Sequence, residues 1–82
     1  MSDSTRAYQT QWQGHICIVL ATTPAQAKAA TFRSARDASF NIQWTDIRCK
    51  RARQYDVLLL SAVRRMTPLT PEVADQIKAQ YR

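Results

Sequence analysis

The sequence predicts a small α+β domain with a β-α-β core, followed by one or two C-terminal helices packed on the sheet. Three observations favour this class. An apolar run rich in β-branched residues covers 15–21, a capped amphipathic segment covers 24–38, and a second apolar segment covers 42–50. Because the chain has only 82 residues, we expect a single domain over residues 1–82.

The N-terminal part predicts an extended start. Residues 1–6 are polar, and we expect them to be disordered. From Tyr8 to Trp12 large and polar side chains alternate, which is typical of a half-buried strand. Gly14 then marks a bulge or a turn, and residues 15–21 predict a central strand that is covered on both faces. Whether the two segments form a hairpin or one bent strand stays open.

The start of a helix is the clearest local signal in the chain. Thr23 suits the N-cap position, because its hydroxyl can accept a hydrogen bond from a free backbone N–H. Pro24 fits the first helical position, and Gln26 predicts a capping box with Thr23. We expect the helix to continue to about Ala38. The stripe that it is expected to bury consists of Ala25, Ala29, Phe32 and Ala35.

Residues 42–50 predict a second strand with an irregularity in the middle. Its apolar side chains change face, from the positions of Ile42 and Trp44 to those of Ile47 and Cys49. A bulge between the two pairs would bring all four side chains to the core, and otherwise the strand changes its buried face. If the two strands of the β-α-β unit are adjacent and parallel, the crossover should be right-handed.

The C-terminal third predicts one or two helices. Asp56 can cap a helix over 57–66, although the part 57–60 could also form a third strand. Thr70, which a proline follows, predicts the start of a last helix near 71–81. The buried stripe expected for this last helix consists of Val73, Ile77 and Tyr81.

Composition and charge limit the function classes. The chain carries 12 Lys and Arg residues against 6 Asp and Glu residues, which gives a formal net charge of +6. This excess favours an anionic partner, such as nucleic acid, a nucleoprotein complex or an acidic protein surface. No apolar run approaches the roughly 20 residues of a membrane helix, and the N-terminus lacks the apolar core of a secretory signal. We therefore expect no membrane association and a cytoplasmic location.

The densest charge lies in residues 48–53, where most side chains are basic and aromatic residues flank the run. The candidate partner-binding residues are Arg48, Lys50, Arg51, Arg53, Trp44 and Tyr55. The basic side chains match phosphate and carboxylate groups and are expected to converge on one rim, while the aromatic rings suit stacking on unpaired bases. The same pattern also fits a solvated strand end whose charges discourage edge pairing. No RNP pattern, GXXG loop or recognition-helix signature accompanies it.

Catalysis and metal binding are not expected. His15, Cys17 and Cys49 could meet across two strands, but no fourth zinc ligand is evident, so both cysteines are predicted to be reduced structural thiols. Asp46 and Lys50 loosely resemble a nuclease pair, without a known catalytic spacing. Neither a Gly-rich phosphate loop nor a nucleophile elbow is present. We expect no cofactor, no small-molecule ligand and no enzymatic activity.

Three runs of the sequence carry a resemblance to known proteins. Ala21–Lys28, Trp44–Arg48 and Arg51–Asp56 resemble segments of short proteins that bacteriophages and prophages encode, most of them uncharacterised. The resemblance covers about residues 16–56 and leaves the final helix outside. It implies a phage accessory role in the cytoplasm of the host cell. It implies no defined activity and assigns no functional residue.

These observations lead to three functional hypotheses. The first is a small basic phage-type accessory protein that binds a polyanionic partner, nucleic acid or a nucleoprotein complex, through its Arg- and Lys-rich edge. The alternative is a phage-encoded inhibitor, such as an anti-defence protein, that binds a host protein and has no enzymatic activity. The third is a structural module of a phage operon. The oligomeric state stays open, with a homodimer as one arrangement.

Overall fold

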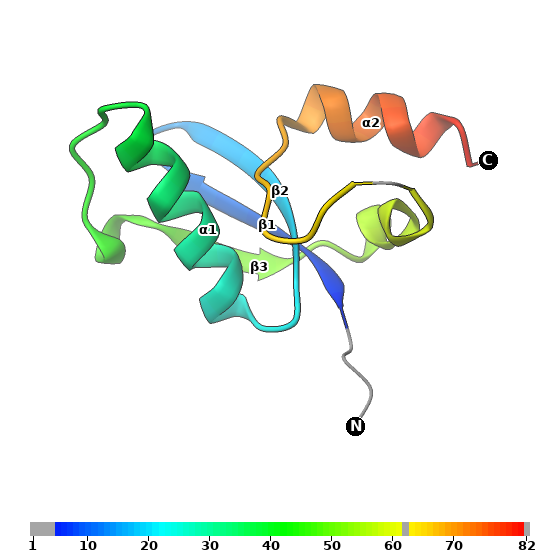
Figure 1. Cartoon of the computed structure of the whole chain (residues 1–82), viewed down its shortest axis with the longest axis horizontal. Coiled ribbons are helices and arrows are strands. Elements are labelled where there is room, and N and C mark those ends of the chain that lie inside the picture. The colour runs from blue at the N-terminus through cyan, green and yellow to red at the C-terminus, as the bar shows by residue number, and fades with distance from the viewer. Residues whose placement is uncertain (1–4, 62, 82) are drawn as a thin grey trace.

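The computed structural model describes residues 5–61 and 63–81. Its strands are β1 (Arg6–Trp12), β2 (His15–Ala21) and β3 (Arg48–Arg51). Its helices are α1 (Pro24–Asp37) and α2 (Pro71–Ala79), with two 3₁₀-helices, η1 (Trp44–Asp46) and η2 (Arg53–Leu60). Figure 1 shows α1 lying across the sheet and α2 near the C-terminus. The predicted α+β class is confirmed.

Disorder is expected for residues 1–6, but the structure describes only some of these residues. Residues 1–4 lie outside the described part of the chain. For Arg6 the prediction is wrong, because this residue opens β1 and is paired with Ala21 in β2. A polar composition alone therefore did not exclude the start of a strand, since the pairing depends on the backbone of the neighbouring strand.

A tight hairpin joins the first two strands. The turn residues Gln13 and Gly14 both have a positive φ, of 45° and 81°, which fits a type I′ turn. The strands then pair antiparallel from Trp12 opposite His15 outward. This pairing decides the alternative that the sequence left open in favour of the hairpin.

The order of the strands is β2-β1-β3, so β1 is the central strand and the expectation of a central β2 is wrong. The apolar sequence of β2 has another cause. One of its faces packs on α1, the other packs on η2 and α2, and a loop residue covers part of its outer edge. At that edge the Ile18 N–H donates to the Leu69 carbonyl over 2.8 Å, and the Leu69 N–H donates back over 2.9 Å.

The predicted second strand is only partly a strand. Residues 44–46 form η1, and β3 keeps the last part of the expected range. The 3₁₀ turn takes the place of the expected bulge, because it brings both Ile42 and Ile47 into the core. Trp44 is an exception, since its side chain stays 41% exposed. Because β2 and β3 both run antiparallel to β1, they are parallel to each other but not adjacent, and the strands of the β-α-β unit are split by β1.

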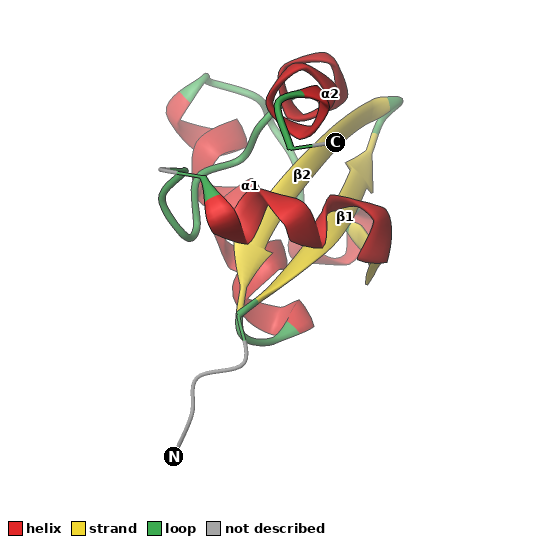
Figure 2. Cartoon of the chain, turned by 90° about the vertical axis from the view of Figure 1, so that its right-hand side faces the viewer, coloured by secondary structure: helices red, strands yellow, loops and turns green. Residues whose placement is uncertain are grey.

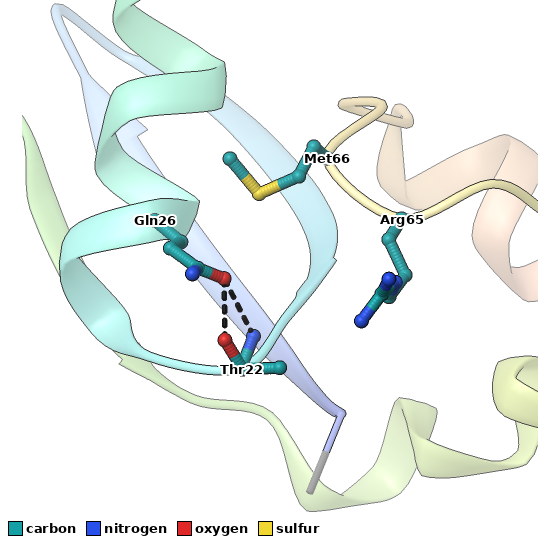
Figure 3. Close-up of a pocket in the computed structure, with 4 residues that line it drawn as sticks. All are labelled: Thr22, Gln26, Arg65 and Met66. Atoms are coloured by element: carbon teal, nitrogen blue, oxygen red, sulfur yellow. Dashed lines mark hydrogen bonds between the residues drawn. The ribbon is translucent and has the colours of Figure 1, made fainter. Parts of the chain in front are cut away.

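The helix α1 begins where the sequence predicts. The Thr23 hydroxyl accepts a hydrogen bond from the Gln26 N–H over 3.1 Å. The second half of the predicted capping box is shifted by one residue, because the Gln26 side chain accepts from the backbone N–H and the hydroxyl of Thr22 instead of from Thr23 (Figure 3). The buried stripe is also rotated from the expected one and consists of Ala27, Ala30, Thr31 and Ala35. Because this stripe contains a polar residue, Thr31, a search for apolar side chains at helical spacing does not find it.

The segment after β3 differs from the prediction. Residues 53–60 form the 3₁₀-helix η2, and the expected helix over 57–66 is wrong. Asp56 caps no helix, because its carboxylate accepts hydrogen bonds from Arg51 and from the Ala7 N–H. The apolar residues 57–60 are therefore neither α-helix nor strand.

The last helix is confirmed, but its buried face is not the expected one. Thr70 caps α2, since its hydroxyl accepts from the Val73 N–H over 3.3 Å. Ala74 is the residue that α2 buries, whereas Val73 and Tyr81 are exposed and Ile77 is half-buried. The small side chain of Ala74 is fully buried in the cluster that includes Leu20.

The core lies on both faces of the sheet. The face toward α1 buries residues that include Tyr8, Val19 and Ala27. The opposite face buries Ala7 and Leu20 beneath η2 and α2. Figure 2, turned by 90°, shows α1 on the left of the strands and α2 above them. Since η2 and α2 pack on only one end of their face, the rest of it is open.

Candidate functional site

The open part of the sheet carries four polar side chains from β1 and β3, which we call the open sheet face: Gln9, Gln11, Arg48 and Lys50. Directly opposite residues in an antiparallel pair point to the same face of the sheet. Gln9 lies opposite Lys50, and Gln11 lies opposite Arg48. Each rung across the two strands therefore combines an amide with a cation.

The distance between the two Cα atoms of each rung depends on whether the rung is a hydrogen-bonded or a non-hydrogen-bonded pair. The Ala52 N–H donates to the Ala7 carbonyl over 3.0 Å, so that pair is hydrogen-bonded. Because the two kinds of pair alternate, both rungs of the open sheet face are hydrogen-bonded pairs, with Cα atoms about 5.5 Å apart. Side chains two residues apart along one strand are separated by about 6.8 Å. The four side chains thus stand at the corners of a small rectangle.

Solvent reaches this rectangle. Gln11, Arg48 and Lys50 are exposed, and Gln9 is half-buried. Together with Cys49 the four residues line a shallow hollow of about 250 Å³. Next to Gln11, on β2, the side chain of Ile16 is 38% exposed on the same face. The surface is therefore mixed, with an apolar margin beside the polar rungs.

The two cations of this face have no partner within residues 5–61 and 63–81. Neither Arg48 nor Lys50 forms a side-chain hydrogen bond or an ion pair there. A carboxylate lies at the margin, where Asp46 lines a smaller hollow with Gln11 and Arg48. One oxygen of Asp46 accepts the Gln43 N–H over 2.9 Å. Both cations are thus available to an external anion.

Arg51 belongs to a different environment. It lies one residue beyond Lys50, so it points to the other face, and its guanidinium pairs with Asp56 through two hydrogen bonds. It also donates to the Ala7 carbonyl over 3.0 Å. This hydrogen-bonded guanidinium lowers the pKa of the Asp56 carboxyl. The ion pair ties β3 to β1 and η2, which is a structural role.

The predicted aromatic residues are also placed away from the open sheet face. Tyr55 is buried and its hydroxyl donates to Asp75 over 2.6 Å, which raises the pKa of the phenol. Trp44 packs edge-on against Phe32 of α1, with ring centroids 6.0 Å apart, and Lys28 lies 5.1 Å from its ring. Both rings are therefore engaged within the fold.

Arg53, the last of the six predicted residues, is exposed in the first turn of η2. Its charge helps to lower the pKa of Asp56, so it lies near the Arg51–Asp56 pair. Of the six residues, the structure thus brings together only Arg48 and Lys50 on the open sheet face.

Sequence reasoning missed Gln9 and Gln11. The alternation over β1 already assigns them to the solvent side of a half-buried strand. Their pairing with the basic residues of β3 depends on the strand order, which joins residues about 40 positions apart in the chain.

The cysteines cannot form a disulfide in this fold. Cys17 and Cys49 lie directly opposite Thr10, one on each side of β1. Two strand spacings separate them, about 9.6 Å, while a disulfide needs Cα atoms within about 7 Å. Burial raises the pKa of both thiols, and the Lys28 ammonium partly offsets this for Cys49. In the described part of the chain, no three His, Cys, Asp or Glu side chains are grouped to hold a metal ion.

A hollow with a volume of about 540 Å³ lies between α1 and the loop before α2 (Figure 3). Its lining residues are Thr22, Gln26, Arg65 and Met66. The carbonyl oxygen of Gln26 is already occupied by the two hydrogen bonds from Thr22. This hollow offers no catalytic group.

Comparison with known proteins gives no assignment. No family model matches the chain, and no match was found among curated proteins or among solved structures. Among the helices described, none combines the length and the apolar character that crossing a bilayer requires. The open sheet face is therefore the basis for a functional assignment.

Proposed function

We propose that this small basic protein binds a polyanionic partner, a nucleic acid or a nucleoprotein complex, through the open sheet face. One observation carries the proposal. Arg48 and Lys50 stand two residues apart on an exposed sheet face, next to two side-chain amides, and neither pairs with an anion within the described residues. A guanidinium and an ammonium at this spacing match the phosphate oxygens of a nucleic-acid backbone.

The charge of the whole chain supports the same partner. A net charge of +6 attracts polyanions over distances of about one Debye length, roughly 8–10 Å at physiological salt. Phosphate contacts by Lys and Arg then supply most of the affinity through counterion release. The phage-type accessory role that the resemblance implies is compatible with such binding.

Binding, and not catalysis, is the activity that we propose for this face. Its polar groups are two amides and two cations, which hold anions but neither attack a substrate nor remove a proton at neutral pH. The thiol of Cys49 lies toward α1, on the other face, and burial raises its pKa. We therefore expect the protein to act by binding its partner and blocking the surface that it contacts.

A matched pair of double variants tests the proposal. Arg48→Gln with Lys50→Gln removes two charges from the open sheet face, and Arg33→Gln with Arg36→Gln removes two from α1 on the opposite side. We measure the affinity for duplex and single-stranded DNA and RNA at two or more salt concentrations. Wild type should bind, and the first variant should lose about 10-fold or more in affinity, with a salt slope shallower by about 2.

The α1 variant is the control for a general effect of charge. It should keep the wild-type salt slope and lose at most a few-fold in affinity, because long-range attraction alone is reduced. Circular dichroism should show that both variants remain folded. Equal losses in the two variants would contradict a site at the open sheet face, and no binding of any nucleic acid by wild type would reject the proposal.

An exposed apolar surface favours a second candidate, an inhibitor that binds a host protein. Leu59 and Leu60 at the end of η2 are both exposed, the latter to 72%, and Tyr81 donates a hydrogen bond to the Leu60 carbonyl. Exposed apolar side chains next to each other are typical of protein interaction sites.

Pull-down from a bacterial lysate with and without nuclease separates the two candidates. A discrete, nuclease-resistant partner that is lost with Leu60→Ser and kept with the Arg48 and Lys50 variant would favour the inhibitor.

A further inference from the structure

We propose that the open sheet face enters the major groove of duplex DNA and reads base edges there, with Gln9 and Gln11 as specificity residues. This inference rests on the proposed function and specifies its substrate class. It assigns a role to the two amides, which a simple phosphate-binding surface would not need.

The dimensions of the sheet fit the groove. The major groove of B-DNA is about 12 Å wide and admits a two-stranded β-ribbon. The open sheet face lies on two strands, β1 and β3, whose axes are about 4.8 Å apart. The helix α1 packs on the opposite face. On the near face, η2, α2 and the loop before α2 cover Ala7, Ile18 and Leu20, so the covered area reaches the neighbour of Gln9. The end with Gln11 and Arg48 is free to approach.

The spacing of the rungs fits the stacking of base pairs. Side chains on one face of a strand repeat every 6.8 Å or so, which is about two steps of 3.4 Å along the duplex. The rung of Gln11 and Arg48 and the rung of Gln9 and Lys50 can therefore address base pairs two steps apart.

The chemistry of each rung matches base edges. A Gln amide can pair with N6 and N7 of adenine through two hydrogen bonds, while Arg48 and Lys50 keep the phosphate contacts of the proposed function beside it. Beside the first rung, the exposed Ile16 side chain supplies an apolar surface that suits the methyl group of thymine. An apolar group, an amide and a guanidinium thus follow one another across the three strands.

Single-stranded nucleic acid fits this face less well. Proteins that bind single strands stack the bases on aromatic side chains. The aromatic residues of the strands, Tyr8 and Trp12, point toward α1, and Trp44 and Phe40 pack against rings of that same side. Within the described residues, no aromatic side chain belongs to the open sheet face.

The experiment begins with enrichment of a random duplex library on wild-type protein. We then measure the affinity for the enriched duplex, for a scrambled duplex of equal composition, and for the single strands of the enriched sequence. The double variant Gln9→Ala with Gln11→Ala removes the amides without a change of charge. Gln54→Ala with Gln76→Ala is the matched control, because both of these amides are exposed on η2 and α2.

Wild type should prefer the enriched duplex over the scrambled one by about 10-fold or more, since one bidentate contact discriminates by about 5- to 150-fold. The Gln9 and Gln11 variant should bind both duplexes as wild type binds the scrambled one, with an unchanged salt slope. The control variant should keep the wild-type preference. Far-UV circular dichroism checks that each variant is folded.

The outcomes separate the two proposals. Binding to duplexes without any enrichment, or a preference that survives in the Gln9 and Gln11 variant, would overturn base reading and leave the proposed function standing. Tighter binding to the single strands than to the duplex would also overturn it. The absence of binding to any nucleic acid would remove both proposals together.

Discussion

Arg51 and Asp56 form a bidentate ion pair, in which Nη1 donates to Oδ1 over 2.7 Å and Nη2 donates to Oδ2 over 2.6 Å. The pair also contacts both backbone groups of Ala7, since the Ala7 N–H donates to Asp56 over 3.0 Å and its carbonyl accepts from Arg51. One basic residue of the cluster is thereby committed to holding β1, β3 and η2 together. Its neighbours Arg48 and Lys50 have no such partner within the described chain.

Replacing Asp56 with Ala should lower the free energy of unfolding by about 1–2 kcal/mol, a value already reduced for the partial exposure of the pair. The Ala7 N–H and the Arg51 guanidinium both lose their acceptor in this variant. Urea denaturation measures the change. Arg48→Ala, at an exposed position, should stay within about 0.5 kcal/mol of wild type. Equal effects of the two substitutions would contradict the structural role of the ion pair.

The lowered pKa of the Asp56 carboxyl should make the stability of the protein depend on pH. The pKa of Asp56 is lowered from its ordinary value of 3.8, chiefly by the hydrogen-bonded Arg51. Its contribution to stability is therefore complete above that value and is lost as the pH falls through the lower pKa of the folded state. Urea midpoints measured between neutral pH and the acid range should fall more steeply below pH 3.8 in wild type than in Asp56→Asn. Parallel curves would show that the pair does not contribute.

A buried hydrogen bond between Thr10 and Thr31 joins the central strand to α1, with hydroxyl oxygens 2.6 Å apart. The Thr31 hydroxyl can also donate to the Ala27 carbonyl. Thr31→Val should cost about 1–3 kcal/mol of stability, because it leaves the buried Thr10 hydroxyl without a partner. The double variant with Thr10→Val should recover much of this loss, as a double-mutant cycle by chemical denaturation can show. Additive losses would contradict the coupling.

The hairpin turn offers a stabilising change. Gln13 adopts a φ of 45°, which costs energy for a residue with a long side chain, whereas Asn tolerates this conformation. Gln13→Asn should raise the free energy of unfolding by about 0.5 kcal/mol, and Gln13→Val should lower it by about 1 kcal/mol. Thermal denaturation measures both. A lower melting temperature for the Asn variant would contradict the type I′ turn.

The two thiols should react slowly in the folded protein. Burial raises the pKa of Cys17 and of Cys49, so less of the reactive thiolate is present at neutral pH than in a free peptide. Alkylation followed by mass spectrometry should show slow modification that becomes fast in denaturant. Because the Lys28 ammonium favours the Cys49 thiolate, Lys28→Gln should slow Cys49 further and leave Cys17 unchanged. A disulfide between the two in freshly purified protein would contradict the strand order.

Local chemistry made several elements predictable from the sequence. The caps at Thr23 and Thr70 require only a hydroxyl and a nearby backbone N–H, so the starts of α1 and α2 could be predicted. The alternation over β1 and the β-branched composition of β2 identified these strands. These signals act over a few residues and do not depend on the rest of the fold.

Contacts between distant residues decided the remainder. The position of β1 between β2 and β3 determines that Gln9 and Gln11 meet Lys50 and Arg48, and no local pattern contains that order. The tertiary structure likewise divided the basic cluster. Arg51 forms an ion pair with Asp56, while Arg48 and Lys50 face solvent. The sequence by itself determined that the chain is basic and α+β. Only packing across the sheet decided which cations can contact a partner, because the interaction free energy of a charged side chain depends on the neighbours that the fold places around it.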